Sequence, residues 1–413
     1  MPFGFVTGCV VGAGLLVNVY LALVARNLPP AEYSYYGAFW SLALIVGFGA
    51  FLPVEQELAR ALHGAGGRRG TMRSAALVTG GLAAAQLALL AAASPLLWPA
   101  IGERPATLVA LGALCVVSAG QFVVRGVLVG LGRLRAHGLV LLGDAGLRLV
   151  FAALVALTAS PGSAGFAWAL VCAIAVAHLP LLPALLRRIR PDTGPAAAGV
   201  RPFATAVAPL LLGSVCAQLL LNGTPVAVSA LAGAADQARA GQFLAAFTLA
   251  RLPLFVVVPL QSAIIPTLTA VATSGGSAPL RRALRRMAGV VLAVGVVGVA
   301  VAFVIGPDLV EAIFGAGYRL PATDLALMAA GVTAHLGLIL VTQALVAGSR
   351  HRDVAWSWLG GLAAAGTVFA VVPDLLLAAE LAFLAGSLAG WLIGTTRLPG
   401  RHTRRGAEPC ATA

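Results

Sequence analysis

Long apolar stretches separated by short polar connections run along the whole chain, and they limit its fold more than any other feature. A transmembrane helix needs about 20 consecutive apolar residues. Twelve such stretches are found, at 5–25, 36–59, 75–99, 107–131, 138–158, 164–186, 203–232, 240–270, 287–306, 323–347, 354–372 and 375–396. The connections between them are short, which leaves no room for a water-soluble catalytic domain.

The composition excludes the other broad classes. Of the 413 residues, 60% are hydrophobic and only 10% are charged. An ordinary soluble domain is about 25% charged because it must cover its surface, and disordered chains are poor in apolar residues. The sequence therefore predicts an all-α integral membrane protein with about 12 transmembrane helices.

The net charge of +13 marks membrane topology. All 27 basic residues are arginine. With the N-terminus in the cytoplasm, most of them fall in alternate, cytoplasmic connections, around 68–73, 133–135, 187–201, 281–286 and 350–352, and in the tail after 396. This positive-inside pattern predicts a multi-pass protein of the cell membrane with both termini in the cytoplasm. Scattered arginines argue against nucleic acid and favour anionic lipid of the inner leaflet as their partner.

Two pairs of similar segments indicate an internal repeat. Residues 128–135 read LVGLGRLR and residues 345–352 read LVAGSRHR, while GAF at 37–39 is matched by GQF at 241–243. Each pair relates a helix to the sixth helix after it, in the same membrane orientation. We expect two six-helix lobes, as in many transporters, with an N-terminal lobe at 1–186, a cytoplasmic linker at 187–202, a C-terminal lobe at 203–396 and a basic cytoplasmic tail at 397–413.

Arg251 is the charge placed deepest in a predicted span. A charge at the bilayer centre costs at least about 2.5–3.5 kcal/mol, so such residues usually face a cavity or a partner. Pro253 and Pro259 follow in the same helix and are expected to bend or break it. Arg251 is therefore a candidate anion-binding residue in a central cavity, the alternative being a structural ion pair.

The second span carries three charges after Pro53. Glu57 and Arg60 are three residues apart and are expected to neutralise each other. Glu55 points elsewhere and reads as a lone carboxylate that carries a proton or a cation. The alternative for this segment is that it lies close to the cytoplasmic interface, where charges cost little.

Other polar residues lie within or beside the spans. Asp144 and Arg148 are four apart, and an intrahelical ion pair is their simplest explanation. Arg125 is placed to reach the inner surface with its long side chain, and Arg26 lies at the outer end of the first span. Asn222 precedes a glycine and is expected to mark a break in a long helix.

Several chemistries lack their motifs. There is no GxxxxGK[ST] loop for nucleotide, no HExxH, no GxSxG and no CxxC. The sequence therefore predicts no enzyme activity, no cofactor and no metal site.

Three segments resemble polysaccharide flippases of the multidrug/oligosaccharidyl-lipid/polysaccharide (MOP) exporter superfamily. They read ARNLPPAEYSYYG at 25–37, GQFLAAFTLARLPL at 241–254 and FVIGPDLVEAIFGAGY at 303–318. The first departs from the pattern at Pro29, where a glycine is usual. The resemblance covers most of the chain and agrees with twelve spans in two lobes.

This resemblance implies a flippase that moves a polyprenyl-diphosphate-linked glycan from the inner to the outer leaflet by alternating access. Arg251, Arg26, Arg125 and Arg60 are then the candidate substrate-binding residues, and glycan-assembly membrane proteins are further partners. Three alternatives remain open. The first is a cation-coupled multidrug exporter of the same superfamily, with Glu55, Glu57 or Asp144 as coupling residues. The second is a membrane glycan polymerase or ligase. The third is a scaffold that transports nothing.

Overall fold

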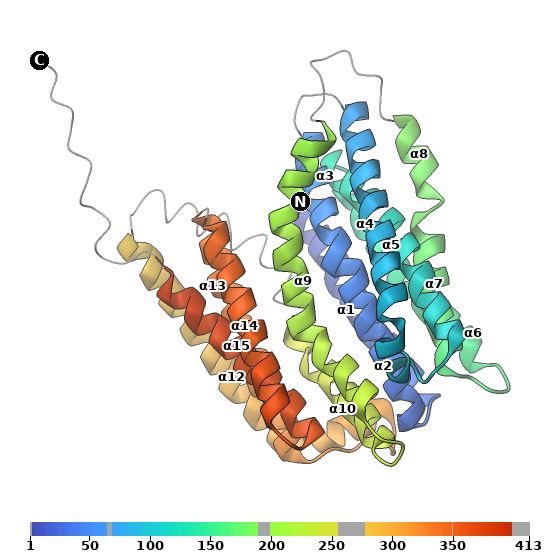
Figure 1. The fold of residues 1–413 in the computed structure, drawn as a ribbon, viewed down its shortest axis with the longest axis vertical. Helices are drawn as coiled ribbons and strands as arrows, with labels where there is room; N and C mark the ends of the chain where they lie inside the picture. Colours follow the sequence, from blue (N-terminus) through green and yellow to red (C-terminus); the bar gives the residue numbers. More distant parts are fainter. Residues whose placement is uncertain (1, 64–67, 189–198, 255–276, 349, 399–413) are drawn as a thin grey trace, which may run out of the picture.

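The computed structural model describes residues 2–63, 68–188, 199–254, 277–348 and 350–398, and within these residues every regular element is a helix (Figure 1). The N-terminal helices are α1 (Pro2–Arg26), α2 (Pro30–Leu44), η1 (Ile45–Gly49), α3 (Ala50–His63), α4 (Arg68–Leu97), η2 (Pro99–Ile101), α5 (Pro105–Gly130), α6 (Leu134–Ala156), α7 (Ser163–His178) and α8 (Leu181–Arg188). They are followed by α9 (Val200–Leu231), α10 (Gln237–Ala250), α12 (Ser277–Phe314), α13 (Ala322–Ala347), α14 (His351–Val371) and α15 (Leu375–Thr396).

Eleven segments of the described chain are long and apolar enough to cross a membrane. They correspond to eleven of the twelve predicted spans. The remaining predicted span, 240–270, is described only up to residue 254, so Pro259 lies outside the described residues. The boundaries differ most at the ninth span, because α12 runs on through Pro307 to Phe314.

The second span is one continuous helical run with a π-helical segment, η1, in its middle. Pro53 follows η1 and has no backbone N–H to donate to the preceding turn. Side chains from neighbouring helices bind carbonyls of the widened turn. Ser214 of α9 donates to the Phe48 carbonyl at 2.9 Å, and Gln86 of α4 donates to the Val46 carbonyl at 3.1 Å. Such partners make irregular helix tolerable inside a bilayer.

The sequence repeat at 128–135 and 345–352 has one backbone hydrogen bond and one N-cap conformation in common between its two copies, while residue 349 lies outside the described residues. The amide of Arg133 donates to the Leu128 carbonyl at 2.8 Å, and the amide of Arg350 donates to the Leu345 carbonyl at 2.9 Å. Both arginines then serve as the N-cap of the next helix, with φ and ψ of −83° and 51° for Arg133 and −97° and 56° for Arg350. These features agree between the two turns, and the two-lobe repeat itself stays a prediction.

Figure 1 shows α12–α15 as one group and α1–α8 as another, with α9 between them. Helix α10 packs against α12 and α13, and we count it with the group of α12–α15. Helix α9 packs against α3 and α4 on one side and against α14 and α15 on the other. The predicted lobe boundaries stay a prediction. Of the predicted linker at 187–202, Arg188 ends α8 and Val200 begins α9, while 189–198 lie outside the described residues. The predicted tail is described only to residue 398.

One end of the molecule, which the sequence predicts to face outside, is formed by five turns. They lie near 27–29, 98–104, 157–162, 232–236 and 315–321. We call this end the predicted outer face. The two helix groups meet here, as Figure 1 shows at its lower edge. The closest approach is that of α2 and α10, where the Pro30 carbonyl fills the space that a side chain on Gly241 would need.

Candidate functional site

Arg251 is buried at the C-terminal end of α10. The helix ends at Ala250, Arg251 is its C-cap, and Pro253 follows two residues later. The Arg251 side chain is only 6% exposed. Its Nη1 donates to the Asn222 Oδ1 at 2.8 Å, its Nε donates to the Phe247 carbonyl at 3.2 Å, and its Cζ lies 4.6 Å from the centre of the Phe247 ring.

No carboxylate of the described residues forms an ion pair with Arg251. The groups that hold it are neutral, namely an amide oxygen, backbone carbonyls and an aromatic face. These groups orient a guanidinium without cancelling its charge. Among the described residues, therefore, no carboxylate compensates the positive charge of Arg251, whereas the buried Arg125 and Arg148 each pair with one.

Asn222 does not break α9, and that prediction was wrong. The helix is continuous from Val200 to Leu231. The fully buried Asn222 donates from Nδ2 to the Gln218 Oε1 at 2.8 Å, one turn earlier, and accepts from Arg251. Because its side chain is engaged by these two partners, it does not compete for the backbone of its own helix.

Glu55 is not a lone carboxylate, and this expectation was also wrong. Its Oε2 lies 3.0 Å from the Nε of Arg125, and both side chains are 10% exposed. The Arg125 guanidinium also lies 4.8 Å from the centre of the Phe122 ring and 5.6 Å from that of Phe48. Arg125 therefore points inward to Glu55 and not toward the surface, because the two buried charges need each other.

The two predicted intrahelical ion pairs are present. Arg60 donates to both carboxylate oxygens of Glu57, at 2.7 and 2.6 Å, and its side chain is 72% exposed. Asp144 and Arg148 pair within α6, and both are buried. Arg148 also lines a small pocket together with Ser118 of α5.

Arg26 lies away from Arg251, at the predicted outer face. It is exposed, and it donates from Nε to the Ile313 carbonyl at 2.9 Å and from Nη2 to the Ala312 carbonyl at 2.5 Å. These carbonyls belong to the last turn of α12, where a cation is favourable. Arg26 thus ties α1 to α12. Among the described residues that the sequence proposed for binding and helix breaks, the structure brings Arg251 and Asn222 together from different helices.

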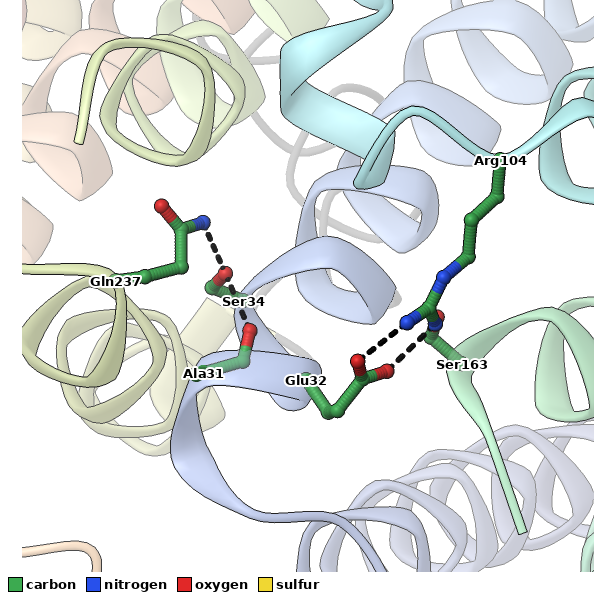
Figure 2. Close-up of polar contacts among 6 residues, drawn as sticks. All are labelled: Ala31, Glu32, Ser34, Arg104, Ser163 and Gln237. Atoms are coloured by element: carbon green, nitrogen blue, oxygen red, sulfur yellow. Dashed lines mark hydrogen bonds and ion pairs between the residues drawn. The ribbon is translucent and has the colours of Figure 1, made fainter. Parts of the chain in front are cut away.

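The N-terminal turn of α2 carries polar contacts to both helix groups (Figure 2). On one side, Arg104 binds Glu32 through two nitrogens and also donates to the Ser163 hydroxyl. The hydrogen bonds to Glu32 raise the pKa of the Arg104 guanidinium above its ordinary value. On the other side, Gln237 at the start of α10 donates to the Ser34 hydroxyl at 2.5 Å. This turn therefore links the two helix groups.

Tyrosines add an aromatic contact at the same place. The Tyr33 ring packs on Tyr318 at a centroid distance of 5.5 Å and on Phe314 at 6.4 Å, and the Tyr318 hydroxyl donates to the Leu28 carbonyl at 2.9 Å. Tyr33 also lies close enough to Arg251 to interact with its charge. The sequence analysis missed this cluster, although four of the chain's five tyrosines fall between residues 20 and 36.

The fold is that of transporters of the MOP superfamily. An inward-facing multidrug resistance MATE family transporter superposes with a TM-score of 0.71 at 15% identity, over 93% of both chains. An outward-facing one superposes with a TM-score of 0.65 at 15% identity, over 96% of this chain and 95% of the other. A MOP superfamily transporter from Pyrococcus furiosus, described as having a binding pocket of reverse polarity, gives 0.65 at 14% identity, over 96% and 95%.

Curated relatives place the chain in a protein family. The Mycobacterium tuberculosis protein titled "Uncharacterized protein Rv1510" is 32% identical over 402 residues, which are 93% of this chain and 88% of that protein. "Uncharacterized protein Rv3630" from the same species is 29% identical over 385 residues, 90% of this chain and 85% of that protein. The chain belongs to the Rv1510 family, as a multi-pass membrane protein with a MATE-like fold. No protein-family model matches it.

Proposed function

We propose that this protein is a flippase that carries a lipid-linked, diphosphate-bearing oligosaccharide or polysaccharide precursor from the inner to the outer leaflet. The observation that carries the proposal is the buried charge of Arg251, which contacts only neutral groups among the residues that the structure describes. A cation kept at such a cost is expected to bind an anion during function. A diphosphate suits it because the guanidinium fork matches phosphate oxygens.

The contacts at the predicted outer face support a carrier that opens alternately to its two sides. The two helix groups are joined there by the contact of α2 with α10, by the edge-to-face contact of Tyr33 with Tyr318 and by the hydrogen bonds of Arg26. In addition, the TM-score is higher with the inward-facing MATE transporter, at 0.71, than with the outward-facing one, at 0.65. Substrate then enters from the cytoplasmic side, where anionic lipid contacts the arginine-rich connections of a cell-membrane protein with both termini inside. Glycan-assembly proteins supply and consume its substrate.

Flipping in reconstituted vesicles tests the role of Arg251. Removing a hydrogen-bonding charged partner costs about 1.5–3 kcal/mol, which corresponds to roughly 10- to 150-fold. We expect Arg251→Ala to lower the flipping rate of a polyprenyl-diphosphate oligosaccharide by this factor. Arg319→Ala is the matched control, because Arg319 is exposed, pairs with Asp308 and Glu311, and is not a candidate binding residue. Equal rates for Arg251→Ala and the unchanged protein, both folded, would refute the proposal.

A cation-coupled multidrug exporter is the second candidate, because two of the superposed structures are described as multidrug resistance transporters. Such a protein would move cationic drugs, which the Arg251 charge disfavours. Vesicles that accumulate a cationic dye, with no flipping of the diphosphate lipid, would favour this function.

A further inference from the structure

Glu380 is a buried carboxyl group without a partner among the described residues. It lies in the second turn of α15, near the predicted outer face, and is only 2% exposed. Its Oε1 accepts no hydrogen bond, and the side chain forms no ion pair with any described residue. Every other buried acid of the described chain, namely Glu55, Glu57 and Asp144, lies beside an arginine.

Among the described residues, the charged groups that act on Glu380 are acids. Helices α9, α13 and α14 pack against α15. Asp324 at the start of α13 and Asp374 at the N-cap of α15 both lie close enough to repel a charge on Glu380. The charged residues of α14 and α9 lie at the opposite ends of those helices, at Arg352 and Asp353 and at Arg201.

The inward face of α15 continues with groups that offer Glu380 no positive charge. Phe383, one turn on, packs on Phe247 at a centroid distance of 5.0 Å and on His335 at 5.5 Å. The His335 Nδ1 is engaged with the Ser387 hydroxyl at 3.2 Å. Arg251 lies beyond this aromatic layer and is held by Asn222.

An ionised carboxylate in these surroundings is strongly disfavoured. It would have lost its water, would have no donor and would face two acids, and each of these factors favours the neutral form. A metal cation would satisfy the charge, but the described residues contain no group of three or more His, Cys, Asp or Glu side chains that could hold one. A proton needs no such ligands.

We propose that Glu380 is a proton-binding site, which holds a proton in the conformation described here and releases it when the surrounding helices separate and admit water. Because the buried form binds the proton more tightly, acid pH favours this conformation and alkaline pH favours the open one. The existence of the open conformation rests on the proposed transport function, whereas the bound proton does not.

Modification by dicyclohexylcarbodiimide tests the bound proton directly, since this reagent reacts with protonated carboxyl groups in apolar surroundings. The full-length protein in lipid vesicles is treated at pH 6 to 9 and its peptides are analysed by mass spectrometry. We expect Glu380 to be modified severalfold more than Glu57, whose carboxylate pairs with Arg60, and less as the pH rises. An unmodified Glu380 in folded protein, or protection by sodium ions at constant pH, would overturn the proposal.

Glu380→Gln tests the link between the proton and the conformation. Glutamine keeps the shape of the neutral acid, so the variant is expected to fold, which circular dichroism checks. The conformation is followed by labelling a cysteine with a maleimide. The cysteine replaces Ala240, which is buried beside the contact of α2 with α10, and the protein's own cysteines are replaced by serine. Labelling is expressed relative to that of the unfolded protein at the same pH, because the thiol itself reacts faster as it ionises. Without Glu380→Gln, this ratio should rise severalfold between pH 6 and 9, whereas in the variant it should stay low throughout.

A pH response that survives in Glu380→Gln would refute the link to Glu380. Labelling requires no substrate, so the outcome is independent of the flipping assay. Modified Glu380 together with failed flipping would leave the proton site standing and would reject the proposed substrate.

Discussion

Single residues show that an arginine inside this bundle acquires its role from what surrounds it. Arg125 and Arg148 lie beside carboxylates, so their charges are cancelled where they stand. Arg251 faces an amide, carbonyls and a ring, so its charge remains available. Both kinds are buried to a similar degree, and burial alone therefore does not distinguish a structural arginine from a candidate binding arginine.

The Glu55–Arg125 pair gives a stability prediction at this scale. Removing one member of a buried ion pair costs about 3–5 kcal/mol, because the other charge is left uncompensated. We expect Glu55→Gln and Arg125→Met each to lower the free energy of unfolding by about this amount, and the double variant to lose less than the sum. Urea unfolding of the purified protein measures all three. Strictly additive losses would show that the two charges do not depend on each other.

At the scale of elements, small residues decide how closely helices pack. On the α14–α15 hairpin, a side chain on Gly390 would meet the Ser357 carbonyl at 2.8 Å, and one on Gly361 would meet the Gly386 carbonyl at 2.7 Å. Helices in a membrane associate through such close contacts, since lipid supplies no hydrophobic driving force between them. The glycines are therefore packing residues of this hairpin.

Two glycine substitutions on this hairpin should act in opposite directions. Gly390→Ala forces α14 and α15 apart, which is expected to cost about 1–3 kcal/mol. Gly366→Ala on the exposed side of α14 meets nothing within 4 Å and should gain up to about 1 kcal/mol from helix propensity. Thermal unfolding in detergent compares the two. A stabilising Gly390→Ala would show that the helices do not pack as described.

For the whole molecule, the contact of α2 with α10 closes the predicted outer face. A Cβ on Gly37 would lie 3.1 Å from the Leu244 Cβ and would clash only with the leucine side chain. Two further interactions lie around the same contact. They are the hydrogen bond from Gln237 to Ser34 and the ring contact of Tyr33 with Tyr318. If the protein alternates between two conformations, this contact must break in one of them.

A disulfide between Gly37→Cys and Leu244→Cys should lock that contact. A disulfide needs a Cβ–Cβ distance of about 3.5–4.5 Å, which a small shift provides, and the leucine side chain that would clash is absent in this variant. We expect oxidation to stop flipping in vesicles and a reductant to restore it. Each single cysteine variant is the control. Full activity of the cross-linked protein would show that α2 and α10 need not separate.

Much of the architecture was predictable from the sequence, because bilayer thickness and charge asymmetry act on local composition. The apolar stretches gave the all-α membrane fold, and the pairs Glu57–Arg60 and Asp144–Arg148 followed from helical spacing alone. The sequence also indicated Arg251 as the deepest charge. It did not indicate that Asn222 holds Arg251, since these residues belong to different helices.

Three features were decided only by the tertiary structure, namely the pairing of Glu55 with Arg125, the contacts of α2 with α10, and the isolation of Glu380. All three depend on which helix faces overlie one another. The sequence by itself determined that the chain spans a membrane many times and where its charges enter the apolar layer. The packing of distant helices determined which charges are cancelled, because Coulomb attraction and hydrogen bonding act between neighbours in space and not in sequence.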